Sequence, residues 1–109
     1  MKKIVILIIM LFGITACTKP EYKKIMEENE FVIIDVRSNF EYSEGHIKNS
    51  INIPHDEINE NIEIEKNKVI FVYCKSGNRS KYAYDLLKSY GYDVYDLGAY
   101  QNIDLEKEK

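Results

Sequence analysis

The sequence has no tryptophan and little cysteine, proline or glycine: its 109 residues include two Cys, two Pro and five Gly. With only Cys17 and Cys74, a disulfide-rich scaffold is excluded. The 15 Lys and Arg residues do not exceed the 18 Asp and Glu residues, which argues against a nucleic-acid partner. Two His without a Cys or carboxylate cluster argue against a metal site. The length allows one domain.

The one long hydrophobic run lies at the N-terminus, where residues 4–14 follow two lysines and precede the small residues that lead to Cys17. This order is typical of a secretory signal, and the run is shorter than the ~20 residues of a membrane-spanning helix. Residues 14–17 resemble the lipobox of bacterial lipoproteins. That resemblance implies a signal peptide over 1–16 and a lipidated Cys17. The domain 17–109 would then be anchored to the membrane, facing the periplasm or the cell exterior. The alternative is an ordinary secretory signal with an incidental Cys.

The remaining chain alternates between helical and strand patterns, which predicts an α/β fold with a small parallel sheet and helices on both faces. Two apolar runs rich in β-branched residues, 31–36 and 69–73, predict buried strands. Shorter strands are predicted at 50–53 and 92–97, and helical segments at 21–29, 40–44, 55–61 and 79–90. The charged end of the chain, residues 104–109, is expected to be frayed.

The loop between the second buried strand and the best helix carries the candidate chemistry. Cys74 lies at a strand end and next to a helix N-terminus, where backbone N–H groups favour an anion. Lys75 and Arg79 add positive charge, and both effects favour the thiolate, the nucleophilic form. Gly77 and Asn78 tolerate left-handed backbone angles, so the loop can curl and point its N–H groups inward. Such a loop also suits an oxyanion.

The order of several motifs resembles the single-domain rhodaneses, a family of sulfurtransferase modules. The matching residues span 31–103: Asp35-Val36-Arg37, Glu41-Tyr42, Gly45-His46-Ile47, Ser50, Asn52-Ile53-Pro54 and the loop Tyr73-Cys74-Lys75-Ser76-Gly77-Asn78-Arg79-Ser80. The resemblance implies a rhodanese-like three-layer fold with four or five parallel strands. The family often has an extra strand before the first helix and a Trp after its last Gly pair. Both are missing here, as in small exported rhodaneses of the phage-shock E type.

The resemblance also implies a two-step sulfur transfer. A small anionic donor such as thiosulfate would give its outer sulfur to Cys74, and a thiol or cyanide would remove it from the persulfide. The loop residues 75–80 would bind the donor and stabilise the persulfide, and no cofactor is implied. For Ser76 and Ser80 we favour turn and helix-cap roles.

Four other residues are interpreted as structural supports for the loop: Asp35, Arg37, Glu41 and His46. Arg37 and Glu41 are expected to form an ion pair that holds the following turn. Asp35 is expected to accept N–H groups after its strand. His46 could act as a base at neutral pH, but within this pattern it is interpreted as structural.

Two other functions stay open. A phosphatase or arsenate reductase of the related cell-cycle phosphatase fold uses a Cys and an Arg separated by five residues, whereas Cys74 and Arg79 are separated by four. The shorter loop favours a single sulfur atom over phosphate. A non-catalytic docking module of the same fold is the second alternative, although such modules commonly lack the Cys.

Overall fold

The structure is a computed structural model and describes residues 21–109. Its helices are α2 (Tyr22–Glu28), α3 (Asn39–Glu44) and α4 (Asn78–Ser89), with short 3-10 turns η1 (His55–Glu57) and η2 (Tyr100–Asn102). Its strands are β1 (Phe31–Asp35), β2 (His46–Ile47), β3 (Ile51–Asn52), β4 (Val69–Cys74), β5 (Asp93–Ala99) and β6 (Lys107–Glu108). The predicted signal peptide and Cys17 lie outside the described residues.

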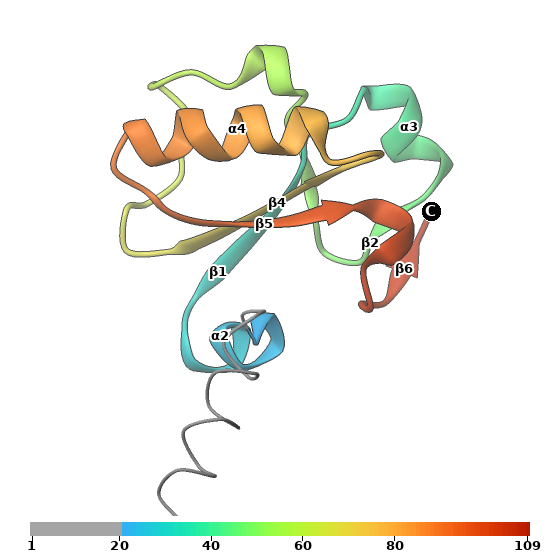
Figure 1. Ribbon diagram of the computed structural model, residues 1–109, viewed down its shortest axis with the longest axis horizontal. Coiled ribbons are helices and arrows are strands. Elements are labelled where there is room, and N and C mark those ends of the chain that lie inside the picture. The colour runs from blue at the N-terminus through green and yellow to red at the C-terminus, as the bar shows by residue number, and fades with distance from the viewer. Residues whose placement is uncertain (1–20) are drawn as a thin grey trace, which may run out of the picture.

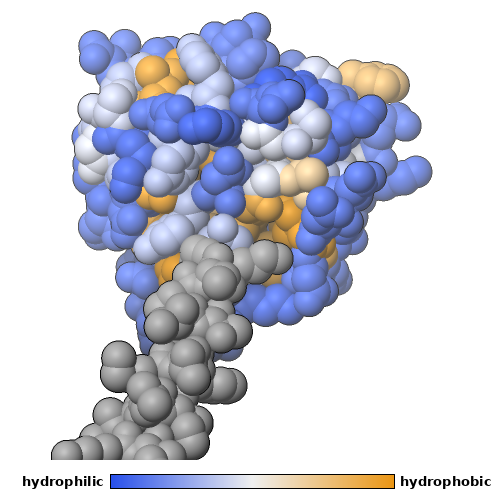
Figure 2. Space-filling view, viewed as in Figure 1, coloured by the Kyte–Doolittle hydropathy of each residue, from blue (hydrophilic) through white to orange (hydrophobic). Residues whose placement is uncertain are grey.

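The main sheet has four parallel strands in the order β3-β1-β4-β5. The alternating sequence pattern predicted a small parallel sheet, though not this order. Helix α4 covers one face, with η1 packed against α4, and α2 lies on the other face (Figure 1). The face seen in Figure 2 is mainly hydrophilic, with several hydrophobic patches between the hydrophilic residues. The predicted α/β fold is therefore confirmed.

Alternation along the central strand builds two hydrophobic cores. In β4, Ile70, Val72 and Cys74 belong to the core beneath α4, whereas Phe71 and Tyr73 belong to the core on the α2 face. All six residues of β4 are buried, which is expected for a strand with parallel neighbours and covered faces. Cys74 thus continues the face that packs on α4, so the alternation directs its side chain toward the helix N-terminus.

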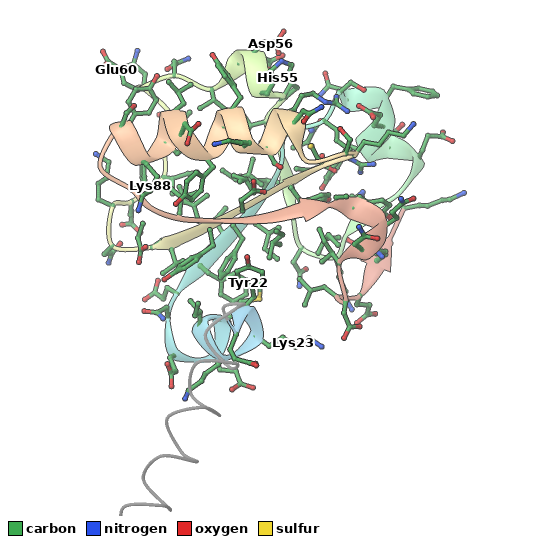
Figure 3. The ribbon with its side chains drawn as sticks, viewed as in Figure 1. Tyr22, Lys23, His55, Asp56, Glu60 and Lys88 are labelled. Carbon is green, nitrogen blue, oxygen red and sulfur yellow. The ribbon has the colours of Figure 1, made fainter. Side chains whose placement is uncertain are left out.

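Helix α2 attaches to the second face mainly through aromatic contacts. Tyr22 points from α2 toward the sheet (Figure 3) and donates a hydrogen bond to the Asp96 carbonyl at 3.0 Å. Its ring makes edge contacts with Phe71 at 5.9 Å and with Tyr95 at 6.2 Å between centroids. This one short helix and the C-terminal segment together cover the face.

The C-terminal end is not frayed, which corrects the expectation for residues 104–109. Lys107 and Glu108 form β6, which pairs antiparallel with β2 through Ile47 and His46. The Lys48 N–H also donates to the Glu106 carbonyl at 2.8 Å. These are backbone bonds with a partner about sixty positions earlier in the chain, which the charged local sequence does not indicate.

One other local expectation changes. The segment predicted as a helix over 55–61 contains only the three-residue turn η1. Within residues 21–109, no helix is both long and apolar enough to cross a membrane.

Candidate active site

Cys74 is the last residue of β4 and lies beneath the N-terminal turn of α4. This loop joins the right-hand end of β4 to α4 in Figure 1. The Cys74 side chain is 0 % exposed, while Lys75 and Ser76, which follow it, are exposed. The sulfur therefore lies under its own loop, at the carboxyl end of a central strand, where α/β sheets place their ligands.

The Cys74 sulfur accepts hydrogen bonds from two backbone N–H groups of the loop. The Gly77 N–H donates at 2.9 Å and the Ser80 N–H at 3.3 Å. The Ser80 hydroxyl lies 3.5 Å from the sulfur and donates to the Gly77 carbonyl at 3.2 Å. A hydroxyl carries one proton, so it can turn toward the sulfur once the thiol has ionised.

These contacts oppose the effect of burial on the thiol. Burial raises the pKa of Cys74, but the Ser80 hydroxyl and the N–H groups of Ser80, Gly77 and Ser76 outweigh it, so the pKa lies below its ordinary value. A buried structural thiol in apolar surroundings would have a raised pKa. The predicted thiolate preference is therefore supported, although hydrogen bonds rather than the charges of Lys75 and Arg79 are its main cause.

Gly77 gives the loop its curl. It is the residue before α4 and adopts the left-handed conformation, with φ 102° and ψ −13°. Glycine adopts this region without the strain that a Cβ atom brings. This conformation turns the Gly77 N–H back toward Cys74. The helix starts at Asn78 with no side-chain cap, so Ser80 does not cap it, which corrects that interpretation.

The predicted ion pair between Arg37 and Glu41 is absent, and each residue pairs with another partner. Glu41 binds Arg79 through two contacts, Oε1 to Nη1 at 2.8 Å and Oε2 to Nη2 at 3.1 Å. Arg37 binds Asp35, two positions before it. A carboxylate can pair with the guanidinium of either Arg37 or Arg79, and the fold determines which of the two lies near it.

Glu41 also closes the N-terminus of α3. The Ser38 hydroxyl accepts the Glu41 N–H, and the Glu41 carboxylate accepts the Ser38 N–H, which is a capping box. The hydrogen bond from Arg79 and those from Ser38 outweigh burial and lower the pKa of Glu41 to about 2. The carboxylate therefore ties α3 to the first turn of α4. The predicted contact between Arg79 and the donor stays a prediction.

Asp35 and Arg37 form a buried pair below the loop. Asp35 is 0 % and Arg37 5 % exposed. Asp35 accepts the Arg37 backbone N–H at 2.9 Å, as predicted, and three side-chain hydrogen bonds, two from Nε at 2.9 and 3.1 Å and one from Nη2 at 2.6 Å. Arg37 Nη2 also donates to the Gly45 carbonyl, and the guanidinium lies over the Tyr100 ring at 4.4 Å. The Arg37 guanidinium is therefore bound by groups of the protein itself, namely Asp35, the Gly45 carbonyl and the Tyr100 ring.

His46 has a structural environment, which agrees with its interpretation. The His46 ring stacks on Tyr42 at 3.8 Å between centroids, and its Nδ1 lies 2.8 Å from the Tyr42 carbonyl. Its Nε2 lies 3.4 Å from the Glu108 carboxylate of β6. None of these contacts involves the Cys74 loop.

Two grooves border the loop, one on each side of the Glu41–Arg79 pair. The first, here called the Lys75 groove, has a volume of about 200 Å³ and is lined by Arg37, Phe40, Glu41, Glu44, Lys75, Tyr100 and Gln101. The second, here called the His55 groove, has about 270 Å³ and is lined by Ser38, Asn39, Pro54, His55, Asp56, Glu57 and Arg79. His55 and Asp56 are seen on η1, above α4 (Figure 3).

Sequence reasoning missed two groups of residues around the loop. Tyr73 is buried behind Cys74, where its hydroxyl accepts the Ile47 N–H at 3.0 Å and lies 3.2 Å from Ser50 Oγ. Tyr100 stacks on Tyr73 at 5.8 Å between centroids. Tyr100 lies in the segment that lacks the family's usual Trp, and that position could have indicated an aromatic wall. Nothing in the local pattern around Phe40 and Glu44 indicated a groove.

Among residues 21–109, no three His, Cys, Asp or Glu side chains are grouped so that they could hold a metal ion. Of the predicted loop residues, the structure brings Gly77 and Ser80 onto the Cys74 sulfur. It leaves Lys75 and Asn78 exposed beside it.

Comparison with known proteins gives the chain a family. The family described as Rhodanese-like domain matches residues 18–104. The thiosulfate sulfurtransferase PspE from Escherichia coli (strain K12) is 36% identical over 80 residues, covering 70% of this chain and 77% of that protein. A solved structure titled "rhodanese with anions from E. coli" has a TM-score of 0.66 at 32% identity, covering 72% of this chain and 96% of the other.

Other relatives are larger proteins. A tRNA uridine(34) hydroxylase from Aster yellows witches'-broom phytoplasma (strain AYWB) is 34% identical over 85 residues, which cover 71% of this chain and 28% of that protein. The adenylyltransferase and sulfurtransferase uba4 from Ogataea parapolymorpha is 34% identical, and the match covers 71% of this chain and 23% of its length. The chain therefore spans under a third of these two relatives. Fold, motif order and similarity agree that this chain belongs to the rhodanese-like domain family, whose members include sulfurtransferases.

Proposed function

We propose that this protein is a thiosulfate-type sulfurtransferase in which Cys74 carries the sulfur as a persulfide. One observation supports this most directly. The Cys74 sulfur accepts two backbone N–H groups, from Gly77 at 2.9 Å and Ser80 at 3.3 Å. Such donors stabilise a thiolate and, after transfer, the anionic outer sulfur of a persulfide. The similarity to the thiosulfate sulfurtransferase PspE supports the same donor class.

In the first step the Cys74 thiolate attacks the outer sulfur of thiosulfate. A new S–S bond forms to Cys74 Sγ, the S–S bond of thiosulfate breaks, and sulfite leaves with the bonding electron pair. The charges balance, because a thiolate and a dianion give a persulfide anion and sulfite. Since Cys74 is 0 % exposed, the loop must move aside for the donor. Lys75, exposed next to Cys74, attracts this dianion electrostatically.

In the second step an acceptor thiolate, or cyanide in an assay, attacks the outer sulfur of the persulfide. The S–S bond to Cys74 breaks, and the electron pair returns to Sγ, which regenerates the thiolate. The loop N–H groups then stabilise the leaving thiolate as they did at the start. The chemistry uses this chain's own groups, and the proposal requires no cofactor.

The proposal is tested by thiocyanate formation from thiosulfate and cyanide. We expect turnover by residues 18–109 and none by the same chain with Cys74→Ser, because a hydroxyl at that position is not a nucleophile of comparable strength. Lys75→Gln should raise the KM for thiosulfate about two- to fivefold, the size of an exposed charge contact. Lys81→Gln is the matched control, because Lys81 is an exposed lysine on α4 that pairs with Asp85.

Two results would contradict the proposal. Hydrolysis of an aryl phosphate or reduction of arsenate by the same protein, without sulfur transfer, would favour the phosphatase alternative. A folded protein with a titratable Cys74 that takes sulfur from neither thiosulfate nor a persulfide would favour a docking module.

We further propose that residues 1–16 are a lipoprotein signal peptide, and that Cys17 is lipidated and anchors the domain 17–109 outside the cytoplasm. The support is the sequence order of the N-terminus, and two or more acyl chains give a stable anchor. Expression of the full chain in a bacterium tests this. We expect the protein in the membrane fraction, and we expect Cys17→Ser to lose the acyl chains in a mass spectrum. A chain that keeps residues 1–16 and stays in the cytosol would contradict the proposal.

A further inference from the structure

The Lys75 groove lies next to the Cys74 loop, because two of its residues directly follow residues at the level of Cys74. Lys75 follows Cys74 directly, and Tyr100 follows Ala99, which pairs with Cys74 across the sheet. An irregularity in the β4–β5 register, where Val72 faces Asp96 and Tyr73 faces Gly98, produces this alignment. Two residues of the groove, Lys75 and Tyr100, therefore lie one position beyond the level of the Cys74 sulfur, and α3 supplies the facing residues Phe40 and Glu44.

Two side chains of opposite charge in the groove, Lys75 and Glu44, form no ion pair among residues 21–109. Arg37 is bound to Asp35, and Glu41 is bound to Arg79. Both Lys75 and Glu44 are exposed. Glu44 is also the last residue of α3, where a helix terminus disfavours a carboxylate. The stability of α3 therefore gives no reason for a carboxylate at position 44.

Two aromatic residues, Phe40 and Tyr100, supply the apolar surface of the groove, and Gln101 adds an uncharged polar side chain. Phe40 is 73% exposed, and the partly buried ring of Tyr100 lies over Arg37 at 4.4 Å. The volume of about 200 Å³ corresponds to roughly seven water molecules at ~30 Å³ each, which suits a molecule of amino-acid size.

The His55 groove on the other side of the Glu41–Arg79 pair has a different charge. Its one cation, Arg79, is bound to Glu41, while Asp56 and Glu57 are exposed acids on η1. This surface repels an incoming thiolate, because like charges raise the cost of approach. The Lys75 groove is therefore the favoured approach for an anionic acceptor.

We propose that the Lys75 groove is the acceptor site, and that it selects a small thiol amino acid over thiols with one charge or none. The carboxylate of the acceptor binds Lys75, its ammonium group binds Glu44, and its carbon chain lies between Phe40 and Tyr100. This inference rests on the proposed sulfur transfer, because only a loaded Cys74 needs an acceptor.

The transfer in this site balances without another reactant. The acceptor thiol loses its proton to water, and its sulfur attacks the outer sulfur of the Cys74 persulfide. The S–S bond to Sγ breaks, the electron pair stays on Sγ, and the product is the persulfide of the thiol amino acid. Lys75 reduces the repulsion between the two sulfur anions as they approach.

The test separates loading from unloading. Cys74 is first loaded with thiosulfate and the excess removed, and the loss of the extra sulfur is then timed by intact mass. Four acceptors are compared at equal thiolate concentration: L-cysteine, mercaptopropionate with only the carboxylate, cysteamine with only the amine, and neutral mercaptoethanol. We expect L-cysteine to unload Cys74 fastest, about two- to fivefold faster per charge contact.

Two variants assign the charges. Glu44→Gln should lower the ratio of the cysteamine rate to the mercaptopropionate rate, and Lys75→Gln should raise it. Glu63→Gln, a change at an exposed acid outside both grooves, is the matched control and should leave the ratio as it is. Equal rates for all four thiols on a loaded Cys74 would overturn this inference while supporting the sulfurtransferase. A Cys74 that never loads would overturn both.

Discussion

At Cys74, two opposing effects set the reactivity of the thiol. Burial raises its pKa, and the hydrogen bonds from Ser80, Gly77 and Ser76 lower it further than burial raises it. Since the thiolate is the form that attacks, the loading rate should fall as the pH drops through this lowered pKa. If Cys74 takes up sulfur as proposed, loading should therefore persist at pH values below the ordinary thiol pKa of about 8.5.

Replacing the Ser80 hydroxyl tests the cause of that lowered pKa. Ser80→Ala removes the group 3.5 Å from the sulfur but keeps the backbone N–H, so we expect the pKa of Cys74 to rise. Below that pKa, sulfur loading should slow about tenfold, in line with a hydrogen bond to a charged group. Thiolate absorbance against pH measures the effect. Ser89→Ala at the far end of α4 is the control, and an equal rise there would contradict the assignment.

At the scale of elements, the Glu41–Arg79 pair joins α3 to α4, and its free energy depends on pH. The pKa of Glu41 is lowered from 4.5 to about 2. A lowered carboxyl pKa gives stability that is fully present above about 4.5 and is lost as the pH falls through about 2.

Glu41→Gln should therefore destabilise the protein at neutral pH. We expect a loss on the order of 1–3 kcal/mol, after allowance for the partial exposure of both side chains. Urea unfolding at several pH values measures it. The difference from the natural protein should shrink as the pH approaches 2, and a difference that stays constant over this range would contradict the role of the ion pair.

The left-handed conformation of Gly77 is expected to matter for both stability and sulfur loading, and Gly91 offers a control. Gly77→Ala meets no atom within 4 Å of the new Cβ, but its φ of 102° costs ~1–2 kcal/mol for an L-residue. We expect lower stability and slower sulfur loading, because relief of this strain turns the N–H away from Cys74. Gly91 has a φ of 95° at the other end of α4.

Gly91→Ala should therefore cost a similar free energy of unfolding and leave sulfur loading at the natural rate. Parallel urea unfolding and loading assays on both variants check this. An equal slowing in both variants would show that lost stability, rather than the orientation of the Gly77 N–H, controls the reaction.

Across the whole molecule, the sequence predicts those helices and strands that depend on residues close together in the chain. The runs at 31–36 and 69–73 and the helix after Gly77 follow from local hydrophobicity, and their order puts Cys74 at a strand end. The partners of Arg37 and Arg79 do not follow. Arg79 meets Glu41 across 38 positions, and no local pattern indicates which carboxylate the fold brings near. The Lys75 groove has the same long-range origin.

The C-terminal strand β6 is expected to contribute to the stability of the whole molecule. A chain that ends at residue 105 loses β6 and the bond from Lys48 to Glu106 but keeps the buried Ile103. We expect it to fold with a free energy of unfolding lower by about 1–3 kcal/mol, the worth of two or three backbone hydrogen bonds. Urea unfolding measures this. An unchanged midpoint would mean that the tail is frayed, as its composition predicted.

Persulfide formation at Cys74 can be measured directly as the intact mass of residues 18–109 after incubation with thiosulfate. We expect a gain of one sulfur atom that cyanide reverses and that Cys74→Ser does not show. No gain with thiosulfate or with a persulfide donor, in a folded protein whose Cys74 still titrates, would rule out sulfur transfer through Cys74.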